Sequence, residues 1–389
     1  MLSATAAILL ALDTGWVFMH FSSPADTRKT TSSKQIETQP DNGARAAVGF
    51  RMKYGTTKWG YIDTKGNVVI QPICYSYCPD FSEGMVPAQY SGKWGYLNDM
   101  GQIVIGPQFD NASPFREYRA AVCMGGKQIT IDHAPIYIGG KCGYIDHRGE
   151  LAIPLRFDDT LDFSEGLAAV GIGSKYGYID ITGKLVIFPQ FDEANPFSDQ
   201  MAAVKMGDKW GYIDHTGNIA ISPRYPYPPE KFFDGRALIQ PNPRIEKYGY
   251  IDKTGRMVIP ARFTNAFSFS EGLAAVLLCP RSGCAYHDNA DLIGDGRWGY
   301  VNTEGKFAIP PKFENAHSFS EGLAAVDNQD YIDKTGKVVI HTNYFTNGSF
   351  SQGLGSVGII YGQYGYINKT GALVVIVPNL VNKIANFHR

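Results

Sequence analysis

Acidic side chains recur at one position of the sequence and are the first candidates for chemistry. A Phe-Ser-Glu-Gly phrase places them at Glu83, Glu165, Glu271 and Glu321. Two carboxylates about 5–9 Å apart can hydrolyse a glycosidic bond, so a row of them could serve a glycan hydrolase. A residue that returns with every copy of a phrase is explained better by a task in every copy, such as a hydrogen bond at a turn or strand start. The structural interpretation is favoured, and the hydrolase remains the alternative.

The other residue types that carry enzyme chemistry do not gather in the sequence. The eight histidines are scattered, and His147 and His215 occupy a turn position that Thr or Lys usually fills. No Gly-rich loop leads into a helix, so the phosphate-binding motifs are missing. No Gly-x-Ser-x-Gly elbow is present either. The sequence therefore predicts no catalytic residue, no cofactor and no enzymatic activity.

Six cysteines form three local pairs: Cys74 with Cys78, Cys123 with Cys142, and Cys279 with Cys284. Aligned with the compact hairpin 204–210, the second pair is directly cross-strand despite the 18 residues between its members, and facing strand residues lie within disulfide range. Disulfides are favoured over free, packed thiols. A metal site is the least favoured interpretation, because Cys-x3-Cys has no second ligand pair beside it. Disulfides in turn indicate an oxidising compartment.

A nine-fold internal repeat accounts for most of the chain. The phrase Gly-Tyr-Ile-Asp, with small changes, returns at intervals of roughly 35 residues, a period typical of repeat architectures. It begins at Gly60, Gly95, Gly143, Gly177, Gly211, Gly249, Gly299, Asp330 and Gly365. A tryptophan precedes it in four units, at Trp59, Trp94, Trp210 and Trp298. We expect each tryptophan to be a structural residue that packs against a neighbouring unit.

Each unit is predicted to be an antiparallel meander of three short strands. The phrases Leu-Ala-Ala-Val and Trp-Gly-Tyr-Ile-Asp form two strands, which the Gly-Asp pair 207–208 joins as a type II′ hairpin in one unit. The period of two leaves the bare Gly211 on the face opposite Trp210, where a neighbouring layer can approach. An apolar triplet forms the third strand, and we expect Pro223 to end it because proline cannot donate to the ladder. A short fourth strand near Phe-Ser-Glu-Gly would complete the unit.

These phrases resemble the WG-repeat family, also called the KWG-repeat family. The stretches Lys58 to Gly66 (KWGYIDTKG) and Lys209 to Gly217 (KWGYIDHTG) match its motif closely. The resemblance covers about residues 45–378. It implies a protein that is often exported or attached to other domains, and it brings no catalytic residues with the motif.

The composition and the repeat together predict the fold class. Tyr and Phe favour strands, whereas the plentiful Gly and Pro favour turns. We predict an all-β protein of tandem three- to four-stranded antiparallel meanders, arranged like the blades of a propeller. Nine units exceed the usual four to eight blades, so an open β-solenoid or superhelical sheet is the alternative.

Four regions follow from the composition along the chain. Residues 1–21 are apolar, 22–44 form a flexible polar linker, 45–380 carry the nine repeats and 381–389 are a tail. The apolar start resembles a signal peptide or N-terminal membrane anchor, which predicts export to the periplasm or cell surface. No Lys or Arg precedes it and Asp13 interrupts it, so a helix buried against the repeats is the alternative. The net charge of −1 predicts no nucleic-acid partner.

Three expansions break the repeat, at 124–141, 226–234 and 279–296. Insertions in a repeat array map to loops on one face, often the binding face, although tolerated surface loops explain them equally well. The stretch 279–297 holds several Asp residues without the alternating spacing of a calcium loop, so no metal is predicted there. The candidate partner contacts are Ile136, Tyr137, Tyr286 and His287. We expect an interaction module whose partner is a protein or a cell-surface glycan, with a purely structural spacer as a further alternative.

Overall fold

The computed structural model describes residues 9–12, 15–18, 45–51, 57–63, 67–74, 81–90, 92–131, 134–241, 247–279, 285–286, 292–293, 296–351, 353–359 and 363–377. Every regular element among them is a β-strand, which confirms the predicted all-β class. The described residues hold no helix with the length and apolar character needed to cross a membrane. The predicted linker at 22–44 and tail at 381–389 lie outside the described residues.

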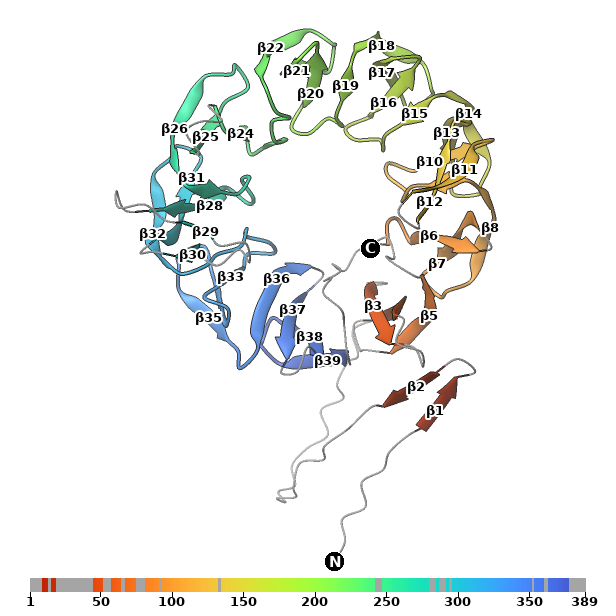
Figure 1. The fold of residues 1–389 in the computed structure, drawn as a ribbon. Coiled ribbons are helices and arrows are strands. Elements are labelled where there is room, and N and C mark those ends of the chain that lie inside the picture. Colours follow the sequence, from red (N-terminus) through yellow and green to blue (C-terminus); the bar gives the residue numbers. More distant parts are fainter. Residues whose placement is uncertain are drawn as a thin grey trace, which may run out of the picture.

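Nine antiparallel sheets follow one another along the described chain, and we call them blades 1 to 9. Figure 1 shows the blades placed one after another around a ring, from blade 1 in orange-red to blade 9 in blue. The strands that contact each other across blade boundaries belong to consecutive blades. The predicted series of three- to four-stranded meanders with a propeller-like arrangement is therefore confirmed.

Three blades have three strands. These are blade 1 with β3 (Arg45–Arg51), β4 (Thr57–Asp63) and β5 (Val68–Cys74), blade 2 with β6 (Met85–Tyr90), β7 (Lys93–Asn98) and β8 (Ile103–Phe109), and blade 8 with β33 (Ala324–Val326), β34 (Asp330–Ile332) and β35 (Val338–His341).

Six blades have four strands. Blade 3 has β9 (Asn111–Ala112), β10 (Ala120–Met124), β13 (Lys141–Ile145) and β14 (Leu151–Phe157). Blade 4 has β15 (Asp159–Thr160), β16 (Leu167–Ile172), β17 (Lys175–Asp180) and β18 (Leu185–Phe191). Blade 5 has β19 (Glu193–Ala194), β20 (Met201–Met206), β21 (Lys209–Asp214) and β22 (Ile219–Tyr225). Blade 6 has β23 (Phe232–Phe233), β24 (Arg236–Ile239), β25 (Tyr248–Ile251) and β26 (Met257–Phe263). Blade 7 has β27 (Asn265–Ala266), β28 (Leu273–Leu278), β31 (Arg297–Asn302) and β32 (Phe307–Phe313). Blade 9 has β36 (Phe345–Ser351), β37 (Leu354–Ile359), β38 (Gln363–Asn368) and β39 (Leu373–Val377).

Three two-stranded hairpins stand apart from the blades in the described chain. The first pairs β1 (Leu9–Leu12) with β2 (Gly15–Phe18), within the apolar N-terminal segment. The second pairs β11 (Lys127–Ile131) with β12 (Ala134–Ile138), so the expansion at 124–141 is an extra hairpin. The third pairs β29 (Ala285–Tyr286) with β30 (Leu292–Ile293), inside the expansion at 279–296.

The short fourth strand is present, and it begins the next blade. In blade 5 the two-residue strand β19 pairs with β20, which pairs with β21, which pairs with the outermost strand β22. Figure 1 shows β22 and its counterparts β8, β14, β18, β26 and β32 on the outside of the ring. Each four-stranded blade therefore takes its innermost strand from the segment that follows the outer strand of the preceding blade.

The prediction that Pro223 ends the third strand is wrong. Strand β22 continues through this proline to Tyr225, with a bulge between the residue pairs Trp210–Tyr225 and Tyr212–Ile221. Because β22 is an edge strand, the missing N–H of proline leaves no ladder bond unmade. The sequence pattern does not show which strand lies at an edge, and this position decides whether proline is tolerated.

The bulge explains the glycine of the Trp-Gly-Tyr phrase. A Cβ atom added to Gly211 would lie 2.4 Å from the carbonyl oxygen of Ile221 and 2.8 Å from the nitrogen of Pro223. The backbone that approaches so closely belongs to the same blade, whereas the sequence suggested a neighbouring layer. Glycine is required here because any side chain would collide with backbone atoms.

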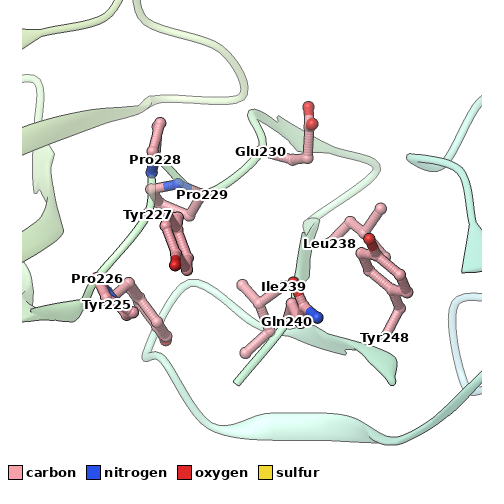
Figure 2. A pocket seen from close by; sticks show the side chains of 10 residues that line it. All are labelled: Tyr225, Pro226, Tyr227, Pro228, Pro229, Glu230, Leu238, Ile239, Gln240 and Tyr248. Carbon is pink, nitrogen blue, oxygen red and sulfur yellow. The ribbon is translucent and has the colours of Figure 1, made fainter. Parts of the chain in front are cut away.

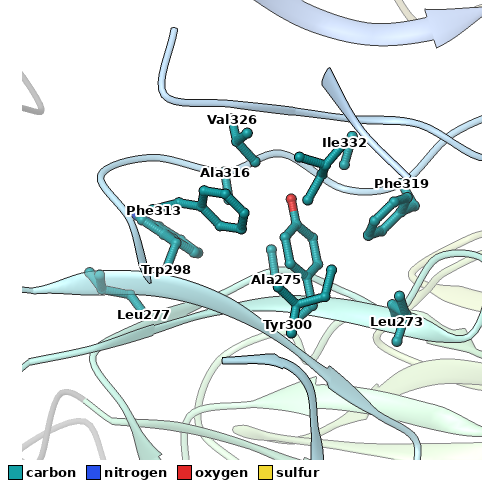
Figure 3. Close-up of a cluster of buried hydrophobic side chains, with 12 residues drawn as sticks. Leu273, Ala275, Leu277, Trp298, Tyr300, Phe313, Ala316, Phe319, Val326 and Ile332 are labelled. Atoms are coloured by element: carbon teal, nitrogen blue, oxygen red, sulfur yellow. The ribbon is translucent and has the colours of Figure 1, made fainter. Parts of the chain in front are cut away.

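The core of the protein lies between consecutive blades. Tyr212 of blade 5 is fully buried, its ring packs edge-on against Phe232 of blade 6 at 4.9 Å, and its hydroxyl donates to the carbonyl oxygen of Glu230 at 2.6 Å. Figure 3 shows the same arrangement between blades 7 and 8, where Tyr300 points toward Phe319 and Ile332. Desolvation by burial raises the pKa of seven such tyrosines: Tyr96, Tyr144, Tyr178, Tyr212, Tyr250, Tyr300 and Tyr331.

Candidate functional site

The recurring acidic residues lie in tight turns with an unusual backbone. Seven of them have φ between 50° and 57°, and the residue after each also has positive φ. They are Glu83, Glu117, Glu165, Asp199, Asp234, Glu271 and Glu321. Residues other than glycine are uncommon in this left-handed region of backbone conformation. A strained conformation repeated in every such turn indicates that each acidic side chain performs a task there.

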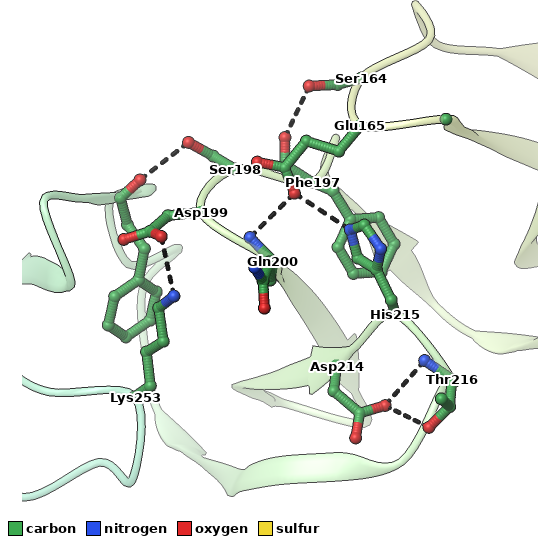
Figure 4. Close-up of polar contacts among 12 residues, drawn as sticks. Ser164, Glu165, Phe197, Ser198, Asp199, Gln200, Asp214, His215, Thr216 and Lys253 are labelled. Atoms are coloured by element: carbon green, nitrogen blue, oxygen red, sulfur yellow. Dashed lines mark hydrogen bonds and ion pairs between the residues drawn. The ribbon is translucent and has the colours of Figure 1, made fainter.

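That task is a contact with the next blade, which we call a clasp. The carboxylate of Glu165 in blade 4 accepts a hydrogen bond from the backbone N–H of Gln200 in blade 5 at 2.8 Å (Figure 4). Each of the seven carboxylates makes the same bond to the equivalent turn of the following blade, with shortest N···O distances of 2.6 to 3.1 Å. The donors, in chain order, are Tyr118, Gly166, Gln200, Gly235, Gly272, Gly322 and Gly353.

A basic side chain of the following blade joins five of the clasps. Lys253 contacts Asp199 at 2.7 Å, and His215 contacts Glu165 at 3.0 Å, as Figure 4 shows. The remaining three pairs are His147 with Glu83, Lys334 with Glu271, and Lys369 with Glu321. The His147 ring nitrogen lies 3.0 Å from its carboxylate without hydrogen-bond alignment. The turn histidines noted in the sequence therefore stand where lysines make the same contact in other blades.

A serine adds a second bond across most of these boundaries. The hydroxyl of Ser164 donates to the carbonyl oxygen of Phe197 in the next blade at 2.7 Å, and Ser198 does the same with Phe232 at 2.8 Å (Figure 4). Thus both polar residues of the Phe-Ser-Glu-Gly phrase act across a blade boundary. The sequence singled out Glu83, Glu165, Glu271 and Glu321 but missed the equivalent acids at 117, 199 and 234, where the phrase is altered. These three acids could have been found from the sequence, because each occupies the third position of its phrase, as the four glutamates do.

The aspartates after Tyr-Ile have a local task within their own turns. Asp214 Oδ1 accepts from the hydroxyl of Thr216 at 2.6 Å and from the backbone N–H groups of Thr216 and Asn218. The Thr216 hydroxyl contributes most to holding the pKa of the Asp214 carboxyl below its usual value. Thr182 acts in the same way on the pKa of Asp180, and Thr335 on that of Asp333. These carboxylates therefore close the turns in which they lie.

The disulfide predicted from the hairpin register is present. Cys123 and Cys142 are directly cross-strand in blade 3, and their sulfur atoms are bonded at 2.07 Å. The bond lies at the base of the extra hairpin β11–β12. Cys279 is also disulfide-bonded, whereas Cys284 and Cys78 lie outside the described residues, as does the side chain of Cys74. No group of three His, Cys, Asp or Glu side chains in the described part of the chain could hold a metal ion.

The insertions lie at the end of the blades opposite the clasps. In an antiparallel blade the turn between the first two strands, which holds the clasp, lies at one end. The hairpin between the second and third strands and the connection to the next blade lie at the other end, which we call the insertion end. The expansion 124–141 joins β10 to β13, 279–296 joins β28 to β31, and 226–231 joins β22 to β23. Only the end of the predicted expansion 226–234, with Asp234, reaches the clasps.

The four candidate contact residues belong to these insertions. Ile136 and Tyr137 are in β12, and Tyr286 is in β29, but their side chains lie outside the described residues, as does all of His287. The backbone positions of Ile136, Tyr137 and Tyr286 therefore place these three residues at the insertion end.

A pocket of about 210 Å³ opens at the insertion end between blades 5 and 6. Its lining comprises Tyr225, Pro226, Tyr227, Pro228, Pro229, Glu230, Leu238, Ile239, Gln240 and Tyr248. Figure 2 shows Tyr227 and Tyr248 on opposite sides, with Ile239 and Gln240 between them. The predicted expansion 226–234 thus contributes one wall of a pocket, which sequence reasoning did not foresee.

The tryptophans of the repeat lie where the blades meet. Trp210 is buried with Phe232 and Ile239 of blade 6, and Trp298 is buried with Phe319 and Val326 of blade 8. Trp94 is half-buried, and the Trp59 side chain lies outside the described residues. The pattern built on these positions matches one family, whose description is "WG containing repeat". The match occurs at seven places along the chain. The matched residues are 59–94, 94–127, 143–176, 176–210, 210–240, 248–278 and 298–330.

The chain belongs to the WG containing repeat family. The matches cover more than half of this WG-repeat protein, and each begins at or beside a tryptophan-equivalent position. They confirm the resemblance seen in the motif. Among curated proteins, no sequence matches this chain.

Solved structures with a similar arrangement are distant in sequence. BamB from Moraxella catarrhalis has 10% identity and a TM-score of 0.35, with 80% of this chain and 92% of that chain covered. A protein of unknown function from Bacteroides caccae has 13% identity and a TM-score of 0.29, with 68% and 92% covered. KlHsv2 with loop 6CD replaced by a Gly-Ser linker has 8% identity and a TM-score of 0.34, with 65% and 86% covered.

Proposed function

We propose that this WG-repeat protein is a non-enzymatic interaction scaffold that holds a partner at its insertion end. The observation that carries the proposal is the separation of the two ends of the blades. The recurring acidic and basic side chains are bound to each other across blade boundaries at the clasp end. The segments that do not recur collect at the opposite end, where a surface specific to this protein can form.

The enzyme alternative relied on the row of glutamates as paired catalytic acids. Each of the seven clasp carboxylates already accepts a hydrogen bond from a backbone N–H of the next blade, and five of the seven also contact a Lys or His. Under the scaffold proposal, Glu165→Gln weakens one blade boundary and nothing else. Turnover of a glycan by the wild-type protein that disappears in this single variant would favour the hydrolase.

Export is the second part of the proposal. The disulfide between Cys123 and Cys142 supports it, because disulfides persist in oxidising compartments and are rare in the cytosol. The apolar segment 1–21 supports it independently as a signal peptide or anchor. Alkylation of free thiols in intact cells of the native host, followed by peptide mapping without reduction, tests the location. Recovery of Cys142 in the alkylated, unbonded form would contradict export.

The partner test uses the insertions themselves. Residues 125–140 and, separately, 280–295 are replaced by the Gly-Asp turn of the hairpin 204–210, and circular dichroism confirms that both variants fold. A photo-crosslinking residue at Tyr137 should capture a partner in the native host, whereas the same residue at the exposed Met100, in the β7–β8 turn at the clasp end, should not. Shortened variants should lose that partner. If the wild-type and shortened chains capture identical sets of partners, the alternative of a purely structural spacer is favoured.

A further inference from the structure

The boundary between blades 5 and 6, where the pocket lies, departs from the pattern that most blades share. In five blades the outer strand ends in a buried phenylalanine, namely Phe109, Phe157, Phe191, Phe263 and Phe313. Blade 5 has Tyr225 at this position, and the side chain is only 7% exposed. The aromatic ring is what these positions share, so the hydroxyl of Tyr225 is a polar group that the other five boundaries lack.

The segment after Tyr225 also departs from the repeat. Lys141 pairs with Asp158 and Lys175 pairs with Asp192 across the equivalent boundaries. Pro226 replaces the aspartate here, and the prolines at 226, 228 and 229 cannot donate backbone bonds to a sheet. The innermost strand β23 therefore starts only at Phe232. The connection stands away from β24, and the pocket fills the space between them.

Four polar side-chain groups of this pocket are not used within the described part of the chain. The hydroxyls of seven core tyrosines each donate to a backbone carbonyl of the next blade. By contrast, the hydroxyls of Tyr225, Tyr227 and Tyr248 and the amide of Gln240 have no hydrogen-bond partner among the described residues. Tyr227 is 61% exposed at the rim. A ligand in the pocket would meet aromatic faces together with several free donors and acceptors.

We propose that this pocket binds one ring of a neutral sugar at the end of, or within, a glycan. The faces of tyrosine rings carry negative partial charge, which suits the C–H face of a pyranose. Hydroxyls around the sugar ring both donate and accept, as do the tyrosine hydroxyls and the Gln240 amide. Among the described residues no lysine or arginine lines the pocket, and Glu230 is part of its lining, so an anionic sugar is disfavoured.

Size and hydrogen bonding favour a sugar over a proline-rich peptide. A pocket of about 210 Å³ lies below the 300–1,000 Å³ typical of sites for drug-sized ligands, so it suits a single ring. Peptides in the polyproline conformation dock along extended aromatic grooves, and proline offers no N–H donor. Such a peptide would leave the side-chain carbonyl oxygen of Gln240 without a hydrogen-bond donor.

The inference deepens the proposed function, on which it rests, by naming the ligand class of one site at the insertion end. The test is saturation-transfer NMR on the full chain with methyl glycosides of glucose, galactose, mannose and N-acetylglucosamine. Methyl glucuronide and a decapeptide of proline are the rival probes. Two variants address the pocket: Tyr227→Ala at the exposed rim, and Tyr225→Phe, which restores the residue that other blades carry. Tyr118→Ala is the matched control, because Tyr118 is 69% exposed at the clasp end.

At least one neutral glycoside should bind the wild-type chain and the control equally. Tyr227→Ala should weaken that binding at least tenfold, and Tyr225→Phe should weaken it several-fold. Absence of any glycoside signal, equal binding by all variants, or preference for the glucuronide or the proline peptide would overturn the proposal. The chain with residues 125–140 shortened keeps the pocket, so it should still bind the glycoside even if the partner proposal fails.

Discussion

Replacement of Gly211 by alanine measures how much the close approach of strand β22 contributes to the fold. The new Cβ would lie 2.4 Å from the carbonyl oxygen of Ile221, whereas ordinary Cβ contacts begin at 3.4 Å. The bulge must therefore move by about 1 Å (3.4 − 2.4) to accept it. Both atoms nearest to the new Cβ are backbone atoms, so no side-chain rotation can relieve the contact.

The movement cannot stay within the bulge. Arg224 donates from β22 to the carbonyl oxygen of Gly255 in blade 6 at 2.6 Å, and Tyr225 is part of the core between the two blades. We therefore expect Gly211→Ala to destabilise this region by about 3 kcal/mol, at the upper end of the usual effect of overpacking. Gly106→Ala in β8 is the control, because a Cβ there meets no atom within 4 Å. That variant should change stability by no more than about 1 kcal/mol, and in the stabilising direction.

Urea unfolding followed by circular dichroism gives the global effect. Hydrogen exchange of the amides in β20, β21 and β22 gives the local effect, which matters because a repeat array sums the stabilities of its units and need not unfold in one step. If Gly211→Ala matches Gly106→Ala in both measurements, steric exclusion by the bulge is not the reason for the glycine in the WG motif.

Three further predictions concern the core, the disulfide and pH. Trp210→Ala should cost roughly 3–5 kcal/mol in urea unfolding, as for other large core truncations; an unchanged midpoint with loss of ligand binding would make the tryptophan a binding residue instead. Replacing both Cys123 and Cys142 by serine should cost about 3 kcal/mol in thermal unfolding, given the sequence separation of 19, and equal stability would argue against the bond. The seven core tyrosines have raised pKa values, so their stabilisation is complete below pH of about 10 and is lost as the pH rises through those higher pKa values. Phenolate absorbance should therefore rise in two stages, exposed tyrosines first and core tyrosines only on unfolding; a single stage at the ordinary pKa would refute their burial.

The repeat allowed much of the fold to be predicted, because each unit serves as a template for the others. Alignment of an expanded unit with the compact hairpin 204–210 gave the correct register for Cys123 and Cys142. Burial of Trp210 between blades followed from its place on the apolar face of its strand.

Features that depend on how strands and blades lie side by side could not be predicted. Pro223 looks like a strand end until β22 is known to be an edge strand. Glu165 looks like a local turn residue until the turn of the next blade is placed beside it. The pocket arises where the connection after Tyr225 leaves the repeat, and the sequence showed only that this segment was different. Contacts between strands or blades that lie side by side leave no periodic pattern in the sequence. The three-dimensional structure was therefore needed to identify them.

The clasps all have the same direction along the chain, since the carboxylate comes from the earlier blade and the N–H from the later one. Each of blades 3 to 8 therefore presents an acceptor on one side and a donor on the other. If recombination duplicates or deletes one whole repeat, the newly adjacent blades meet with both groups in place. The number of repeats can thus change during evolution without a new set of contacts between blades having to evolve. Lineages can vary the size of the array while keeping the sequence of each unit.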